Sequence, residues 1–185
     1  MSTATPTRLY YTDSDEANEL LATDPLALLI GFALDQQVSV QTAFLGPLKI
    51  KQRLGTLEIA RRDPAEVEAA FRETPAVHRF PGAMAARVQD LCALVEDEYG
   101  GEASRLWREA TDSDDLRRRI KALPGFGEMK IKALSAVLAK RFGVKVAEGL
   151  APSHPTLGDV DSREALEAYQ EKKRAYKAKM RAEHR

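Results

Sequence analysis

The stretch Leu123-Pro124-Gly125-Phe126-Gly127 separates two segments of helical periodicity and decides how this part of the chain folds. Before it, a helix that Ser113 can cap is predicted to run to Ala122, and after it apolar spacing predicts a helix over residues 128–142. Two glycines spaced by one residue let the backbone turn sharply and let a ligand approach the main chain. The turn leads into a helix N-terminus, where free N–H groups and the helix dipole favour a phosphate. The stretch therefore predicts a phosphate-binding helical hairpin, and the simpler alternative is a plain turn between helices.

Helical signals dominate the rest of the chain. The pairs Asp24-Pro25 and Asp63-Pro64 each predict a helix start, because aspartate can cap free N–H groups and proline fits the first turn. Residues 26–34 are apolar on all sides, so their helix is predicted to be buried. Residues 144–161 have no periodicity and predict an irregular loop, after which Asp161 or Ser162 can cap a last helix. Since no stretch alternates convincingly with period two, the predicted fold class is all-α.

Composition and charge limit the class of protein that this chain can be. The chain has 185 residues, 44% of them hydrophobic and 30% charged, which is typical of one globular domain. The formal net charge is zero, yet the segment from Arg163 to Arg185 holds eight basic and four acidic residues. A basic segment of this kind can bind a polyanion even in a neutral protein. The single cysteine, Cys92, cannot by itself form an intramolecular disulfide or hold a zinc ion or an iron–sulfur cluster. Without a long apolar run or a signal-peptide pattern, we expect a soluble cytoplasmic protein without a membrane partner.

A second segment, Leu34-Asp35-Gln36-Gln37-Val38-Ser39-Val40, stands at the end of the predicted buried helix, about 90 residues before the hairpin. It resembles the Gln-Gln-(Ile/Val)-Ser segment of the 3-methyladenine branch of the helix-hairpin-helix (HhH-GPD) DNA glycosylases. The pentapeptide 123–127 resembles the hairpin of the same superfamily, whose members include 3-methyladenine DNA glycosylase II and endonuclease III. The resemblance covers roughly residues 25–145.

This resemblance implies a two-lobed helical bundle over residues 1–162, with the hairpin at 113–142, followed by a basic C-terminal helix or tail at 163–185. In the family, main-chain amides of the hairpin hold the phosphate backbone of double-stranded DNA, often with a bound monovalent cation. The residues implied to contact DNA are Leu123, Pro124, Gly125, Phe126, Gly127, Lys130, Gln36, Gln37 and Ser39. A side chain near the Gln-Gln segment fills the gap left by the flipped base, a role that Gln36 or Gln37 can take. The alternative is that both glutamines satisfy backbone groups at a helix end.

The family also uses an aspartate near the N-terminus of the helix that follows the hairpin unit. Family spacing points to about position 148, where this chain has Glu148, whereas Gly158-Asp159-Val160-Asp161 resembles the turn that carries the acid. Asp161 is therefore the first candidate for the catalytic acid, followed by Asp159 and Glu148, and the alternative is that Asp161 only caps a helix. Members that also cleave the strand carry a lysine two residues after the second hairpin glycine. That position is Met129 here, so we expect Lys130, one residue later, to contact phosphate or solvent.

The expected function is a monofunctional DNA glycosylase of base excision repair, a monomer associated with the nucleoid. By resemblance it removes a damaged, alkylated base from duplex DNA by base flipping and hydrolysis without a cofactor. The single cysteine and the widely separated histidines predict no iron–sulfur cluster and no metal site. The alternative is a noncatalytic DNA-binding or damage-sensing protein that uses the same hairpin. A helical protein-interaction domain is a third class, but it leaves the hairpin without a purpose. The first two differ in geometry: an enzyme needs one of the three acids to face a pocket near Gln36 and Gln37.

Overall fold

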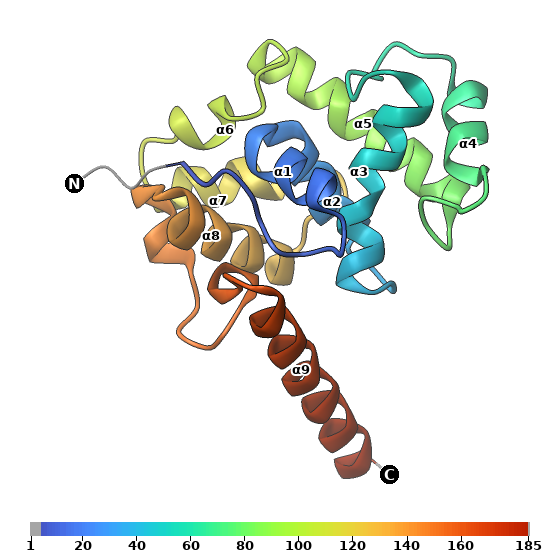
Figure 1. Cartoon of the computed structure of the whole chain (residues 1–185). Helices are drawn as coiled ribbons and strands as arrows, with labels where there is room; N and C mark the ends of the chain where they lie inside the picture. The colour runs from blue at the N-terminus through green and yellow to red at the C-terminus, as the bar shows by residue number, and fades with distance from the viewer. Residues whose placement is uncertain (1–4, 185) are drawn as a thin grey trace.

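A computed structural model describes residues 5–184, and its regular structure there is entirely helical, in agreement with the predicted all-α class (Figure 1). The α-helices are α1 (Asp15–Thr23), α2 (Pro25–Leu34), α3 (Val40–Leu54), α4 (Pro64–Arg72), α5 (Pro81–Tyr99), α6 (Arg105–Arg108), α7 (Ser113–Lys121), α8 (Glu128–Phe142) and α9 (Arg163–Glu183). Two short 3₁₀-helices, η1 (Lys145–Leu150) and η2 (Leu157–Asp159), lie in the segment predicted to be an irregular loop.

Helix α2 is the centre of the hydrophobic core, as its apolar sequence predicts. Every residue from Leu26 to Leu34 is buried, and the helix packs on α1, α3 and α5. Gly31 allows α3 to come close, because a Cβ atom there would lie 2.4 Å from the ring of Phe44. That ring in turn packs against Tyr11 and Phe32, with centroid distances of 5.0 and 5.1 Å. The end of α2 is therefore held rigidly, and the segment that follows it starts from a fixed position.

The helices on either side of the quoted pentapeptide form as predicted. Asp112, rather than Ser113, caps α7, because its side chain accepts a hydrogen bond from the Asp115 N–H group. Helix α8 spans residues 128–142 and packs on α7, η1 and η2. The turn between α7 and α8 lies beside the end of α2, since the Lys130 side chain reaches the backbone of Ala33.

Helix α9 attaches to the body only at its beginning. Ser162 caps it, while Asp161 is exposed and makes no capping hydrogen bond. Leu166 is buried, and the side-chain amides of Gln170 and Gln41 bond to each other at 2.6 and 2.9 Å. Beyond these contacts the helix projects away from the body (Figure 1).

Within residues 5–184, no single helix is long and apolar enough to cross a membrane. Helices α1 and α2 reach the required length and apolarity only when they are counted together, across a sharp bend, and α2 is buried in the core.

Candidate functional site: a pocket between the α2–α3 turn, α8 and α9

A pocket of about 830 Å³ opens where the turn between α2 and α3 meets the beginning of α8 and the first half of α9. The predicted residues Gln37, Ser39 and Lys130 line it. The structure adds further side chains to this lining that the sequence did not single out as site residues. The ionisable ones are Asp35, Arg79, Lys132, His154, Tyr169, Lys173 and Lys177. Its size is within the range of ordinary ligand sites, and it is large enough for one nucleobase. The pocket thus unites the Gln-Gln segment with the start of α8, the helix that follows the pentapeptide 123–127.

Asp35 is the single carboxylate among the residues that line this pocket. It follows the last residue of α2 and is half-buried. In the described part of the chain its carboxylate has no hydrogen-bond or ion-pair partner. Burial raises the pKa of Asp35 above its ordinary value, although Lys173, Lys130 and Lys177 oppose that shift. A half-buried, unpartnered acid in a cleft is a typical candidate for acid–base or electrostatic catalysis.

Lys130 is the second ionisable group in the pocket. It is half-buried, its Nζ donates a hydrogen bond of 3.1 Å to the Ala33 carbonyl, and it lies 5.6 Å from the Phe126 ring centroid. Burial lowers the pKa of Lys130 to about 8, while the nearby Asp35 opposes the shift. A simply solvated lysine, one of the two alternatives for Lys130, does not match this half-buried position, and the phosphate contact stays a prediction. The neighbouring Met129 is 84% exposed. Both residues line the pocket, Lys130 half-buried and Met129 at its exposed edge, because a helical rotation of about 100° separates them.

The two glutamines adopt different conformations. The Gln36 side chain accepts a 2.5 Å hydrogen bond from Arg87, and its carbonyl lies 3.0 Å from Nε2 of His78. Nδ1 of this buried histidine accepts a hydrogen bond from the Phe80 N–H group, so Nε2 carries the proton and donates to Gln36. Gln37 is exposed at the pocket with φ of 57°, a left-handed conformation that L side chains rarely adopt. Neither glutamine side chain bonds to backbone groups of the described residues, so the helix-end alternative is not what the structure shows.

Arg87 of α5 joins the two predicted segments. Its guanidinium group bonds to Gln36, and its side chain lies against Gly125, where an added Cβ atom would approach Nε within 2.9 Å. Gly125 also has φ of 79°, a conformation that favours glycine, and an added side chain there would have to displace the end of Arg87. The turn is anchored by the buried side chains of Leu123 and Phe126, whereas Gly125 and Gly127 are exposed. The main chain of the hairpin is therefore accessible from outside beside the Gln-Gln segment.

The three acids proposed from the sequence lie elsewhere, and none of them lines the pocket. Asp159 accepts a 2.8 Å hydrogen bond from the Thr156 N–H group, which is part of the capping box of η2. It also pairs with Lys140 at 2.7 Å. Asp161 is exposed before α9, and Glu148 is exposed on η1. Ser39, which does line the pocket, caps α3 through a 3.1 Å hydrogen bond from the Thr42 N–H group.

The arginines of α7 are bound by acids within the protein. Arg117 pairs with Glu128 at the first position of α8, while Arg118 and Arg119 both pair with Asp115. The lysines that line the pocket, Lys130, Lys132, Lys173 and Lys177, form no ion pair in the described part of the chain. The cationic side chains available to bind an anion therefore lie around the pocket, whereas the arginines of α7 are already paired with acids.

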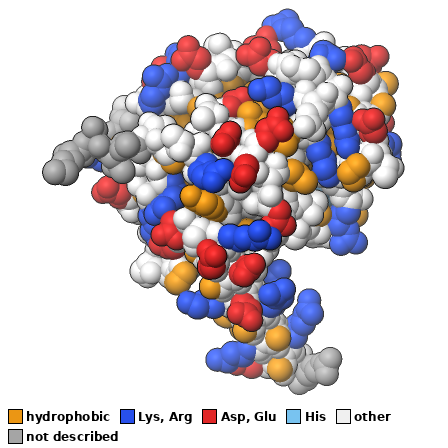
Figure 2. All heavy atoms as spheres, viewed as in Figure 1, with side chains coloured by type: hydrophobic (Ala, Val, Ile, Leu, Met, Phe, Trp, Pro, Cys, Tyr) orange, Lys and Arg blue, Asp and Glu red, His pale blue; other side chains and the backbone are white. Residues whose placement is uncertain are grey.

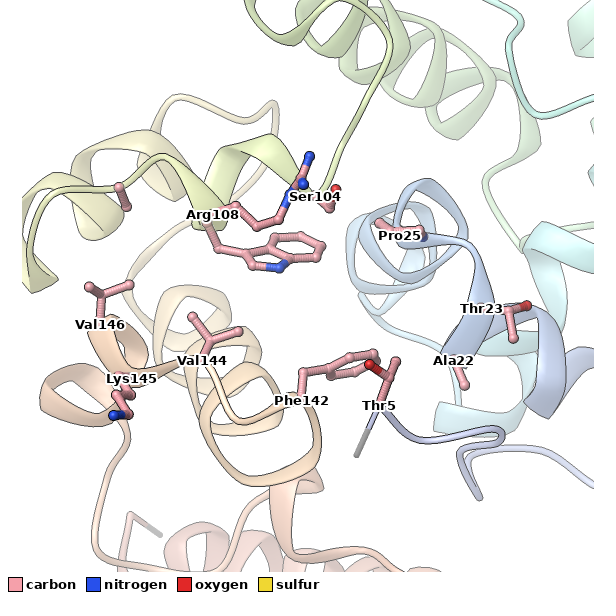
Figure 3. Close-up of a pocket in the computed structure, with 12 residues that line it drawn as sticks. Thr5, Ala22, Thr23, Pro25, Ser104, Arg108, Phe142, Val144, Lys145 and Val146 are labelled. Atoms are coloured by element: carbon pink, nitrogen blue, oxygen red, sulfur yellow. The ribbon is translucent and has the colours of Figure 1, made fainter. Parts of the chain in front are cut away.

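A second hollow of about 670 Å³ lies between α6, the end of α8 and the beginning of α2 (Figure 3). Phe142, Val144 and Val146 give it apolar walls, and Arg108 and Lys145 are the charged residues that line it. Among the described residues that line it there is no carboxylate or histidine, so no acidic group stands beside Lys145 there.

Asp35 belongs to the Gln-Gln segment 34–40, so the sequence contains a signal for it as a candidate site residue. It stands at the end of an apolar helix, next to the two glutamines, where the first ionisable side chain after a buried stretch is held near the core. His78 and Arg87 had no such signal, since each is more than 40 residues from the turn that it supports.

Comparison of the chain with protein-family models, with curated proteins and with solved structures gave no match.

Proposed function

We propose that the protein is a DNA glycosylase that binds a damaged base in the pocket at the α2–α3 turn and hydrolyses its N-glycosidic bond. The observation that carries this proposal is the half-buried, unpartnered carboxylate of Asp35 in a base-sized pocket bordered by Gln37 and Lys130. The finer reading, a two-lobed HhH-GPD bundle with a helix-hairpin-helix at residues 113–142, is part of the same proposal. It is supported by the sequence resemblance and by the exposed glycines of the turn.

Double-stranded DNA is the ligand that best accounts for the surroundings of the pocket. The exposed main chain at Gly125 and Gly127 can receive a phosphate at the start of α8, and Lys132, Lys173 and Lys177 add positive charge around the pocket. Gln37 is a long neutral side chain that can fill the space of an extruded base and bond to the base left behind. Its unusual backbone conformation is typical of functional positions.

The chemistry needs one carboxylate. As the bond between C1′ and the base nitrogen breaks, its electron pair leaves with the base and positive charge develops on the sugar. The Asp35 carboxylate stabilises that charge and takes the proton of the water that attacks C1′. Lys130 is a positioning residue in this scheme, because its ammonium group ties α8 to the end of α2 and favours the ionised form of Asp35.

A noncatalytic DNA-binding protein is the second candidate. The placement of Asp159, Asp161 and Glu148 outside the pocket favours it, since the family position of the catalytic acid is then without a pocket-facing residue. The two candidates differ in whether Asp35 takes over that role.

The test is base removal from labelled duplexes, each carrying one damaged base, followed by hot alkali to reveal abasic sites. We expect cleavage by the wild-type protein only after alkali, and a loss of about 100-fold or more with Asp35→Asn. Asp161→Asn and Glu148→Gln are the matched controls and should keep the activity. Duplex binding by Asp35→Asn should be retained, since asparagine replaces an acid that holds no other group.

Other outcomes assign the function differently. Activity lost in Asp161→Asn and kept in Asp35→Asn would return the catalytic role to Asp161. Binding to duplexes without base removal from any of them would support the noncatalytic candidate. A borohydride-trapped covalent complex that disappears in Lys130→Met would contradict a monofunctional mechanism, because trapping requires an amine bound to the sugar.

A further inference from the structure

The projecting part of α9 is the least explained element of the fold. From Glu171 to Glu183 every residue is exposed, and at about 1.5 Å per residue this segment is about 20 Å long. A helical segment of this length without a buried side chain is only marginally stable by itself in water. A ligand that binds along it would supply the stabilisation that the body does not.

The charge of this segment indicates the ligand. Six cations, Lys172, Lys173, Arg174, Lys177, Lys179 and Arg181, stand against two glutamates, Glu171 and Glu183. In the described part of the chain none of the six forms an ion pair, in contrast to the arginines of α7. Figure 2 shows Lys and Arg side chains along the projecting helix beyond the body. Unpaired cations on one extended element fit a polyanion of matching length.

One side of α9 is continuous with the pocket. Tyr169, Lys173 and Lys177 line the pocket, and steps of three and four residues place Tyr176 and Met180 on that same side. Tyr176 is 64% exposed and Met180 is 37% exposed. The pocket side of the helix thus alternates lysines with flat or flexible apolar side chains as it leaves the body.

We propose that this side of α9, defined by Lys173, Tyr176, Lys177 and Met180, contacts the DNA strand next to the nucleotide that enters the pocket. Lys173 and Lys177 bind successive phosphates, and Tyr176 packs on the sugar or base beside the extruded nucleotide. This inference rests on the proposed function, whose ligand it shares. Two apolar side chains are too few to anchor the helix in a lipid surface, which requires a broad apolar face.

The test compares two double variants of the full-length protein that remove the same charge. Lys173→Gln with Lys177→Gln changes the two lysines that line the pocket, and Lys172→Gln with Lys179→Gln changes a flank centred about 130° from them, beyond Tyr176. The probe is a duplex with a stable abasic-site analogue, so binding is measured without base removal. We expect the pocket-side variant to lower the slope of log K against log salt by about 1.8, or about 0.9 for each lost phosphate contact. The matched variant should change the slope by less than half as much, and Tyr176→Ala should weaken binding by about tenfold.

The outcomes separate this inference from the proposed function. Equal slope changes in the two double variants would overturn it, because they would show general charge attraction rather than a contacting side. Base removal with an unchanged slope in both variants would also overturn it while leaving the glycosylase intact. A changed slope without any base removal would keep α9 as a DNA contact and reject the enzyme. Tighter α9-dependent binding to single-stranded RNA, or to vesicles with 30% phosphatidylserine, would replace DNA as the partner.

Discussion

At the scale of single residues, the site depends on two ionisable side chains that burial brings toward neutrality. Burial raises the pKa of Asp35 and lowers that of Lys130 to about 8, since leaving water disfavours the charged form of each. The two residues come from segments separated by more than 90 positions, and the hydrogen bond from Lys130 to Ala33 holds them at one pocket. Their pKa shifts make the proposed activity dependent on pH in a defined direction.

The proposed mechanism uses ionised Asp35 and protonated Lys130. Lysine is charged below its pKa, so single-turnover base removal should fall as the pH rises through about 8. Lys130→Arg should keep the rate high above pH 8, because arginine stays protonated throughout this range. Lys130→Met should be slow at every pH and lack this alkaline decline. A wild-type rate that continues to rise between pH 8 and 9 would contradict the role of the ammonium form.

Gln37 offers a second prediction at this scale. The left-handed backbone conformation of Gln37 destabilises the folded state by about 1 kcal/mol for any residue that has a side chain. Glycine avoids this strain, but it loses more backbone entropy when the chain folds. Gln37→Gly should therefore leave the melting temperature unchanged or higher, yet lower the affinity for a duplex with an abasic-site analogue. Gln37→Asn, which tolerates this conformation and keeps an amide, is the control. A melting temperature lowered by several degrees, with affinity retained, would argue against the gap-filling role.

At the scale of elements, the turn between α7 and α8 uses its two glycines for different reasons. Gly125 has a positive φ and lies against Arg87, so the fold itself requires it. Gly127 has an ordinary φ of −95°, and an added Cβ atom would meet nothing within 4 Å. Within the described structure nothing demands glycine at position 127, and close approach of a ligand is the reason that the proposed function supplies.

The two glycines therefore predict different outcomes for one substitution. Gly125→Ala should destabilise the protein by about 1–2 kcal/mol, measured by denaturant unfolding, because of backbone strain and displacement of Arg87. Gly127→Ala should leave the free energy of unfolding within about 0.5 kcal/mol of wild type. It should nevertheless weaken duplex binding, since the new methyl group stands where the phosphate backbone comes nearest. Unchanged binding by Gly127→Ala would remove the turn from the proposed DNA interface.

At the scale of the whole molecule, the protein combines one buried centre with a projecting, charged arm. Helix α2 packs on α1, α3 and α5, and the loop before α5 is joined to the α2–α3 turn through His78. This histidine is 1% exposed and donates through Nε2 while it accepts through Nδ1. It therefore has to remain neutral for both hydrogen bonds to persist.

This requirement predicts how stability depends on pH. Burial lowers the pKa of His78 below its ordinary value of 6.5, and Arg87 and Lys130 act in the same direction. Between the two values the unfolded chain binds a proton and the folded chain does not, so acidification favours unfolding. The contribution of His78 to the melting temperature should be constant above about pH 7 and fall as the pH decreases below 6.5. In His78→Gln, which has no titrating ring, the part of this decline above pH 5 should disappear; if it persists, other groups cause it.

Much of the architecture could be predicted from local patterns. The Asp-Pro pairs place the starts of α2 and α4, and the apolar run after Asp24 predicts a buried helix. Pro47 lies within α3 and obscures that helix in the sequence, since proline normally breaks a helical pattern. Asp161 illustrates the opposite limit: it has the residue type and the local turn expected of a catalytic acid, yet it is exposed outside the pocket.

The sequence by itself therefore determined the all-α class, the turn at 123–127 and the buried helix that precedes the Gln-Gln segment, because caps, glycines and apolar spacing act within a few residues. Only the tertiary structure decided which side chains share the pocket. Asp35, Lys130 and Tyr169 meet there because α8 and α9 converge on the end of α2. Burial then sets the pKa values of Asp35 and Lys130, and burial depends on contacts between distant segments that no local pattern contains.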